Sequence, residues 1–111
     1  MPVQVIVDQQ GPLPIKITFN SLTSSPVYVE VNGSVWSTVP NTMIGIEALV
    51  DGINVVGKAM IYSNTASTHR TVVPSYGQIQ LGPGQHTIML SPATPTTTSD
   101  QNDFYTAVIH Y

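Results

Sequence analysis

One group of aromatic and polar residues in this sequence could bind a ligand without reacting with it. Tyr28, Glu30 and Asn32 alternate along a run of β-forming residues, and Trp36, the single tryptophan, follows shortly after. Exposed tyrosine and tryptophan rings can pack against the C–H faces of sugars, while amide and carboxylate groups bond the sugar hydroxyls. These four residues therefore predict a carbohydrate-binding site. The alternative is that Tyr28 and Trp36 form a cross-strand aromatic pair in the core or at a subunit contact.

A second polar group precedes the last apolar segment. Asp100, Asn102 and Asp103 supply carboxylate and amide oxygens close together in the sequence. Calcium binds about six to eight such oxygens, so this segment is a candidate calcium site. Asp and Asn side chains also cap turns by bonding nearby backbone groups, and that role stays open. No cofactor other than calcium is expected.

Catalytic patterns are weaker. His69, His86 and His110 could bind zinc if the fold brought them together, but their spacing matches no ligand motif. Glu30 and Glu47 are the pair of carboxylates that a glycosidase would need, yet each is expected to point outward from a strand. The sequence has no G-x-S-x-G nucleophile motif. We therefore predict that the protein is not an enzyme.

The composition restricts the classes of partner. Charged residues make up 8% of the 111 residues, and only three of them are Lys or Arg. Binding to duplex nucleic acid or to anionic lipid requires clustered cations, so neither partner is expected. Cysteine is absent, which excludes disulfides and thiolate metal sites. No apolar run approaches about 18 residues, so no membrane insertion is expected.

The polar surface must consist mainly of Ser, Thr, Asn and Gln. Such a composition is common in secreted, viral and sugar-binding β proteins. The segment Met1–Val5 shows no basic region followed by an apolar one, so no signal peptide is visible. An extracellular or virion-surface location is favoured.

Apolar and polar residues alternate with period two along most of the sequence, which predicts β-strands. No segment shows a sustained apolar repeat at helical spacing. About nine short strands, separated by Gly- and Pro-rich turns, predict one all-β domain over residues 1–111. The expected architecture is a two-sheet antiparallel β-sandwich of jelly-roll type.

Three turn signals suggest how the strands pair. Asn32-Gly33 and Asp51-Gly52 tolerate positive φ and each predicts a tight hairpin. Gly82-Pro83-Gly84 predicts a third hairpin. Gly57 is expected at a bulge or a close backbone approach. Residues 91–102, rich in Pro and Thr, are expected to form the longest loop.

The segment Leu81–Leu90 (LGPGQHTIML) resembles the L-x-x-G-x-H-T-I-x-L strand–turn–strand of bacterial and phage β-sandwich modules. Residues 46–60 are similar to the strand–Asp-Gly–strand hairpin of the same modules. They include galactose-binding-like carbohydrate-binding modules and the trimeric C1q/TNF-like jelly rolls of phage-tail and bacterial surface proteins. The resemblance implies a lectin-like module, with avidity gained as a homo-oligomer, or alternatively a structural assembly domain.

Overall fold

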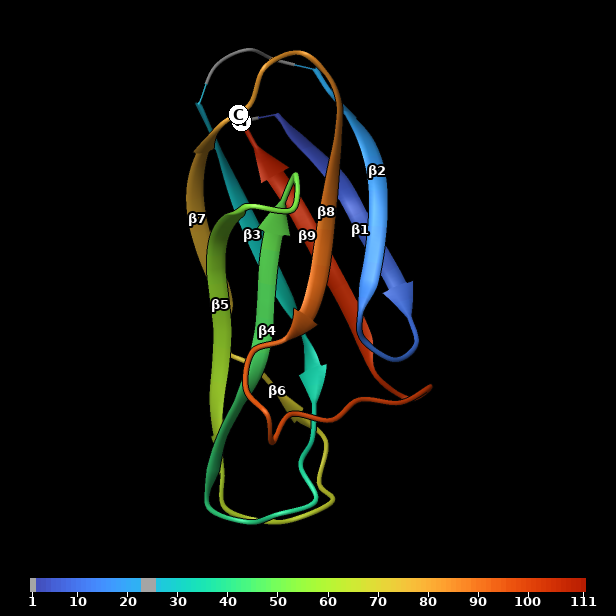
Figure 1. Ribbon diagram of the computed structural model, residues 1–111, viewed down its shortest axis with the longest axis vertical. Helices are drawn as coiled ribbons and strands as arrows, with labels where there is room; N and C mark the ends of the chain where they lie inside the picture. The colour runs from blue at the N-terminus through green and yellow to red at the C-terminus, as the bar shows by residue number, and fades with distance from the viewer. Residues whose placement is uncertain (1, 23–25) are drawn as a thin grey trace.

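The computed structural model describes residues 2–22 and 26–111, and this part of the chain is built from strands without any helix (Figure 1). The sequence also predicts a polar loop over residues 21–26, which lies partly outside the described residues. No helix in the described part is long and apolar enough to cross a membrane. The strands are β1 (Val3–Gln10), β2 (Ile15–Ser21), β3 (Pro26–Val35), β4 (Thr42–Val50), β5 (Asn54–Ser63), β6 (Arg70–Thr71), β7 (Ser75–Gln80), β8 (Gly84–Pro92) and β9 (Phe104–His110).

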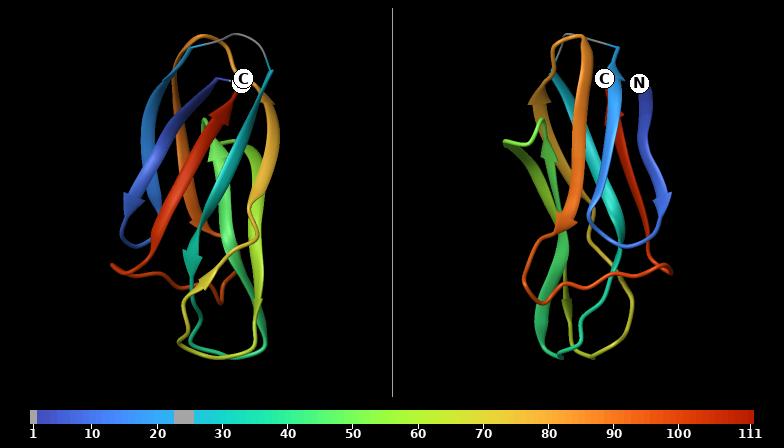
Figure 2. Two further views of the ribbon diagram at one scale, coloured as in Figure 1. Left: turned by 180° about the vertical axis from the view of Figure 1, so that it is seen from behind. Right: turned by 45° about the vertical axis from the view of Figure 1, so that its right-hand side comes forward.

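Two antiparallel sheets pack face to face, as the two turned views show (Figure 2). The first, which we call the β3 sheet, has the order β1-β9-β3, and both β6 and β7 pair with β3. The second, the β4 sheet, has the order β2-β8-β4-β5. The predicted all-β sandwich is therefore confirmed. The last strand, β9, lies between β1 and β3 in the first sheet.

The core forms between the sheets because the inward positions are apolar at every second residue. Val27, Val29 and Val31 of β3 are at most 1% exposed. The inward residues of β4, such as Ile44 and Ile46, face them and are fully buried. Burying each such side chain contributes about 1.5–3 kcal/mol. The residues between them point outward, and they form the outer faces of the sandwich.

One of the three predicted hairpins is confirmed. Asp51 (φ 54°) and Gly52 (φ 77°) form the turn between β4 and β5 in the left-handed region that this turn type requires. Gly57 pairs with Ala48, and the register then shifts by one residue. The bulge expected at Gly57 is therefore confirmed.

The other two hairpin predictions are wrong. Asn32-Gly33 lies inside the continuous strand β3, where Gly33 pairs with Tyr105 of β9. A Cβ at Gly33 would overlap the Tyr105 ring, so packing requires this glycine, not a turn. Gly82-Pro83-Gly84 reverses the chain, but β7 pairs with β3 whereas β8 pairs with β2 and β4. This turn connects the two sheets instead of closing a hairpin.

Two glycines allow the edges of the two sheets to meet. A Cβ at Gly77 of β7 would overlap the carbonyl oxygen of Val56, and a Cβ at Gly57 of β5 would overlap the Ser75 hydroxyl. The backbones of β5 and β7 are therefore in close contact, although the two strands belong to different sheets. This contact closes one side of the sandwich and fixes the position of β7 beside β3.

Candidate ligand-binding face

The outer face of the β3 sheet carries three of the four residues predicted to bind a ligand. Tyr28, Glu30 and Asn32 alternate with buried valines along β3, so all three point outward. The neighbouring strands add further outward side chains. We call this surface the β3 face, and define it by Tyr28, Glu30, Asn32, Tyr76, Phe104 and Thr106.

Glu30 lies at the centre of the β3 face and orients two rings. Its Oε1 is 2.8 Å from Nε2 of His110, and its Oε2 accepts a hydrogen bond from the Tyr76 hydroxyl at 3.2 Å. The negative charge of Glu30 raises the pKa of Tyr76 above its usual value. Tyr76 is 64% exposed and Tyr28 is 49% exposed. The carboxylate therefore holds an aromatic ring in place on an accessible surface.

A pocket of about 260 Å³ lies at the lower end of this face, near the end of β3. Its aromatic component is Phe104, which is 47% exposed. The Oδ1 atom of Asn32 accepts a hydrogen bond from the Gly33 backbone N–H at 2.8 Å, which orients the amide. The lining residues include no charged group and are Asn32, Gly33, Ser34, Thr71, Phe104 and Thr106. The pocket thus combines an exposed aromatic ring with an amide and three hydroxyls, groups suited to a neutral polyhydroxylated ligand.

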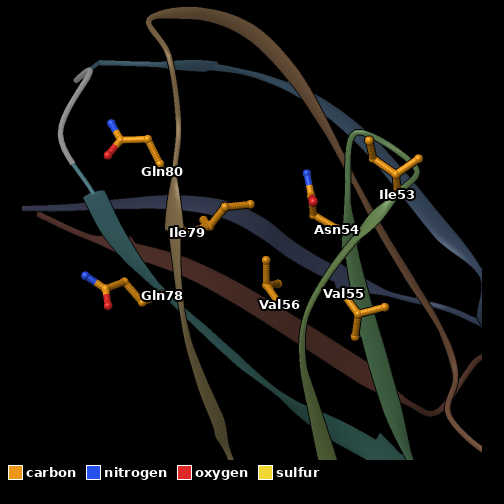
Figure 3. Close-up of a pocket in the computed structure, with 7 residues that line it drawn as sticks. All are labelled: Ile53, Asn54, Val55, Val56, Gln78, Ile79 and Gln80. Atoms are coloured by element: carbon orange, nitrogen blue, oxygen red, sulfur yellow. The ribbon is translucent and has the colours of Figure 1, made fainter.

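A larger groove of about 500 Å³ opens between β5 and β7 (Figure 3). Val56 and Ile79 point toward each other inside it, while the side chains of Gln78 and Gln80 point away (Figure 3). Its lining contains aliphatic and amide groups but no aromatic ring. The groove therefore lacks a flat surface for stacking, and the smaller pocket on the β3 face is the better candidate despite its volume.

Trp36 lies away from the other predicted binding residues. It forms an isolated bridge with Thr98, with N–O distances of 2.9 and 2.7 Å, and its ring centroid is 5.7 Å from that of His69. Tyr28 lies in β3 and Trp36 directly follows the end of the same strand, so the two rings do not face each other across a strand pair. The predicted cross-strand pair is wrong because the hairpin at Asn32-Gly33 does not form. Trp36 instead packs against the segment before β9.

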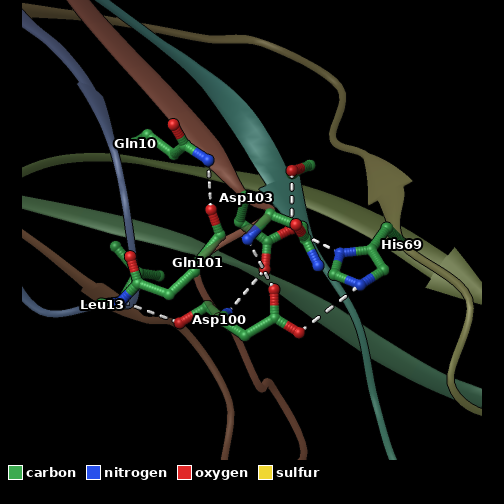
Figure 4. Close-up of polar contacts among 9 residues, drawn as sticks. Gln10, Leu13, His69, Asp100, Gln101 and Asp103 are labelled. Carbon is green, nitrogen blue, oxygen red and sulfur yellow. Dashed lines mark hydrogen bonds and ion pairs between the residues drawn. The ribbon is translucent and has the colours of Figure 1, made fainter.

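The segment before β9 is held by a buried carboxylate (Figure 4). Asp103 is fully buried. Its Oδ1 accepts a hydrogen bond from the Ser34 hydroxyl at 2.7 Å and lies 2.7 Å from Nδ1 of His69. Its Oδ2 accepts a hydrogen bond from the Asp100 backbone N–H at 2.8 Å. The hydrogen bond to Asp103 raises the pKa of His69.

The same segment is attached to the turn between β1 and β2. The Leu13 N–H donates a hydrogen bond to the Ser99 hydroxyl at 2.7 Å. The Gln10 side chain donates a hydrogen bond to the Gln101 carbonyl (Figure 4). Because Ser34 also lines the pocket, this network connects the segment before β9 to the β3 face.

The predicted calcium ligands lie within this network. Asp100, Asp103 and His69 offer ligand atoms within 4.8 Å of one another. Asn102 contributes its backbone N–H, which donates to Oδ1 of Asp100 at 2.8 Å, the geometry of an Asx turn. Calcium binding stays a prediction. If calcium binds here, the unfolding temperature of the protein should rise when calcium chloride is added. An unfolding temperature that stays the same at millimolar calcium would mean that these residues only cap the turn.

The three histidines do not form one zinc site. His86 belongs to the β4 sheet, whereas His110 lies on the β3 face. Each histidine of the chain instead pairs with its own carboxylate. His69 pairs with Asp103 and also with Asp100, His86 pairs with Asp51, and His110 pairs with Glu30.

The two candidate glycosidase carboxylates are also apart. Glu47 lies on the outer face of the β4 sheet, opposite Lys58 of β5. Glu30 points outward from the β3 sheet, on the other side of the sandwich. The two carboxylates therefore cannot flank one glycosidic bond.

The His86–Asp51 pair predicts a maximum in stability at mildly acidic pH. Nδ1 of His86 is 2.7 Å from Asp51 and Nε2 is 2.7 Å from the Gly82 carbonyl, so both ring nitrogens face acceptors. The hydrogen bond to Asp51 raises the pKa of His86 above 6.5, and the same bond, with that from the Thr87 N–H, lowers the pKa of Asp51 below 3.8. The histidine's contribution to stability is complete below about pH 6.5 and is lost as pH rises through its folded-state pKa. The contribution of Asp51 is present above pH 3.8 and is lost as pH falls.

We therefore expect the unfolding temperature to be highest between about pH 4 and pH 6.5 and to fall on both sides. The measurement is thermal unfolding followed by circular dichroism across this range. His86→Gln should reduce the fall on the alkaline side. A wild-type profile that rises steadily from pH 5 to pH 8 would contradict this assignment.

No protein-family model matches the sequence, and no curated protein matches it. Solved structures share the fold. One is described as "EclA C-terminal domain; sugar-binding protein", with a TM-score of 0.51 and 16% identity over 94% of this chain and 70% of that chain. Another is an exo-β-1,3-galactanase from Phanerochaete chrysosporium with β-1,3-galactotriose, with a TM-score of 0.52 and 11% identity over 99% of this chain. This chain spans 30% of the galactanase chain. The resemblance to β-sandwich modules expected from the sequence is thus confirmed at the level of the fold.

Proposed function

We propose that this chain is a non-catalytic, single-domain carbohydrate-binding module whose ligand contacts the β3 face. The observation that carries the proposal is the pocket in which the exposed Phe104 ring lies beside the Asn32 amide and the hydroxyls of Ser34, Thr71 and Thr106. An aromatic ring can pack on the apolar face of a sugar while its hydroxyls bond to the surrounding amide and hydroxyl groups.

The fold comparisons support this class of ligand. One similar structure is described as a sugar-binding protein, and another was solved with β-1,3-galactotriose. The separation of Glu30 from Glu47 supports a role without hydrolysis, because a glycosidase needs two carboxyl groups within about 10 Å, on either side of the scissile bond. Galactose and β-1,3-galactotriose are therefore sensible first probes.

The test is a glycan array that includes neutral monosaccharides and oligosaccharides, followed by calorimetry on the strongest hits. We expect at least one neutral glycan to bind, and Phe104→Ala to weaken that binding at least about tenfold, since a buried aromatic contact contributes more than 1.4 kcal/mol. Tyr62→Ala is the control, because Tyr62 is 49% exposed on the outer face of the β4 sheet. Binding to no glycan, or equal weakening in both variants, would refute the proposal.

A structural assembly role is the alternative, and one observation favours it. On the outer face of the β4 sheet, Met43 (44% exposed) lies opposite Tyr62 (49% exposed). Val55, which is 51% exposed, lies opposite Leu49 on the same face. Met43 and Tyr62 adjoin each other, and adjoining exposed apolar groups are typical of subunit contacts. Two results together would establish this role instead. The protein would bind no glycan, and light scattering would show a homo-oligomer that the substitution Tyr62→Ala dissociates.

A further inference from the structure

The β3 face carries three exposed aromatic rings on three adjacent strands. Phe104 of β9 is 47% exposed, Tyr76 of β7 is 64% exposed, and Tyr28 of β3 is 49% exposed. Phe104 and Ser34 line the same pocket, whereas Tyr76 lies opposite Glu30. Strands rise about 3.3 Å per residue, so the rings are distributed over about 20 Å along β3, between Ser34 and Tyr28. This span is far longer than one sugar ring.

Hydrogen-bonding groups lie between the rings along the same path. Asn32 is directly opposite Thr106, and Glu30 contacts both His110 and Tyr76. At the far end Tyr28 is opposite Gln78. Aromatic and polar groups therefore alternate along the face.

The charges on the face indicate which class of glycan fits. Glu30 contributes a carboxylate at its centre. Lys16 and Lys58 belong to the β4 sheet. Arg70 directly precedes the pocket residue Thr71 in β6, so its side chain points to the opposite side of the strand. Among the described residues, no lysine or arginine of the β3 sheet points out on this face to balance an acidic sugar.

We infer that the β3 face binds a linear, uncharged oligosaccharide along β3, with Phe104 at one end and Tyr28 at the other. This inference rests on the proposed carbohydrate-binding function and specifies its ligand. A monosaccharide can occupy the pocket of about 260 Å³ at Phe104, but it cannot also reach Tyr28. Affinity should therefore increase with the number of linked sugars, because each added ring gains contacts with Tyr76, Glu30 or Tyr28.

The experiment uses calorimetry to compare the affinities of the protein for glycans of different lengths. The first series is galactose and β-1,3-galactotriose. The second is the oligosaccharide that binds most tightly on the array, together with its shortened forms. We expect the oligosaccharide to bind at least tenfold more tightly than its monosaccharide. Tyr28→Ala should weaken oligosaccharide binding at least tenfold more than monosaccharide binding. The control Tyr62→Ala should change neither. An oligosaccharide of equal length that contains a uronic acid should bind at least tenfold more weakly than the neutral one.

The outcomes separate this inference from the proposed function. Equal affinity for the monosaccharide and the oligosaccharide would overturn the extended site while leaving a sugar-binding pocket. Equal weakening of both ligands by Tyr28→Ala, or equal binding of the acidic oligosaccharide, would overturn it as well. Binding to no glycan of any length would instead refute the proposed function. Circular dichroism checks that each variant is folded. We expect Tyr28→Ala to fold because Tyr28 is exposed.

Discussion

Asp103→Ala is expected to lower the free energy of unfolding by about 3 kcal/mol or more. Asp103 is fully buried, and its two oxygens accept hydrogen bonds from the Ser34 hydroxyl and the Asp100 backbone N–H while also pairing with His69. Removing the buried carboxylate leaves these part-buried donors without their acceptor, and a buried donor left unsatisfied costs about 1–3 kcal/mol. The network also positions Ser34 in the pocket, so ligand binding should weaken too.

Urea unfolding at pH 6 measures this effect. Asp103→Asn should lose less stability, because it keeps the shape and one acceptor oxygen. Asp8→Ala removes an exposed carboxylate and should change the unfolding free energy by less than about 0.5 kcal/mol. A loss below about 1 kcal/mol for Asp103→Ala would show that the buried carboxylate does not hold the segment before β9.

Gly77→Ala is expected to destabilise the fold by about 3 kcal/mol. The new Cβ would overlap the carbonyl oxygen of Val56, which is a backbone atom and cannot rotate away. The contact between β5 and β7 must then open. Because β7 carries Tyr76 and Gln78, its displacement would also disturb the β3 face.

Gly82→Ala is the matched control. A Cβ at Gly82 has no atom within 4 Å, so the substitution should change the free energy of unfolding by less than about 0.5 kcal/mol. Chemical unfolding of both variants gives the comparison. Equal midpoints for Gly77→Ala and Gly82→Ala would mean that the two sheets do not meet at Gly77 as described.

The strands and one tight turn could be predicted from patterns among residues close together in the sequence. The period-two alternation in β3 and β4 is visible in the sequence because each strand needs an inward apolar face. Asp51-Gly52 was predicted as a turn because its conformational requirement is local. Asn32-Gly33 has the same local signal, but its glycine is required by Tyr105, a residue distant in the sequence. No local pattern contains that information.

The candidate site was predicted in part for the same reason. Alternation alone places Tyr28, Glu30 and Asn32 on one side of a strand. Trp36 was wrongly grouped with them because a hairpin was expected where β3 continues.

Phe104 and Tyr76 were missed as site residues. The alternation of the last strand, in which Tyr105 is buried, could have placed Phe104 on an outer face. Only the sheet order, however, brings β9 and β7 beside β3 and so joins these rings to Asn32 and Tyr28.

The most direct test of ligand binding on the β3 face is a map of backbone amide chemical shifts during titration with the neutral oligosaccharide that binds most tightly. The account predicts that the changes concentrate at Asn32, Phe104, Tyr76 and Tyr28. Changes confined to the outer face of the β4 sheet, or to the groove between β5 and β7, would contradict it.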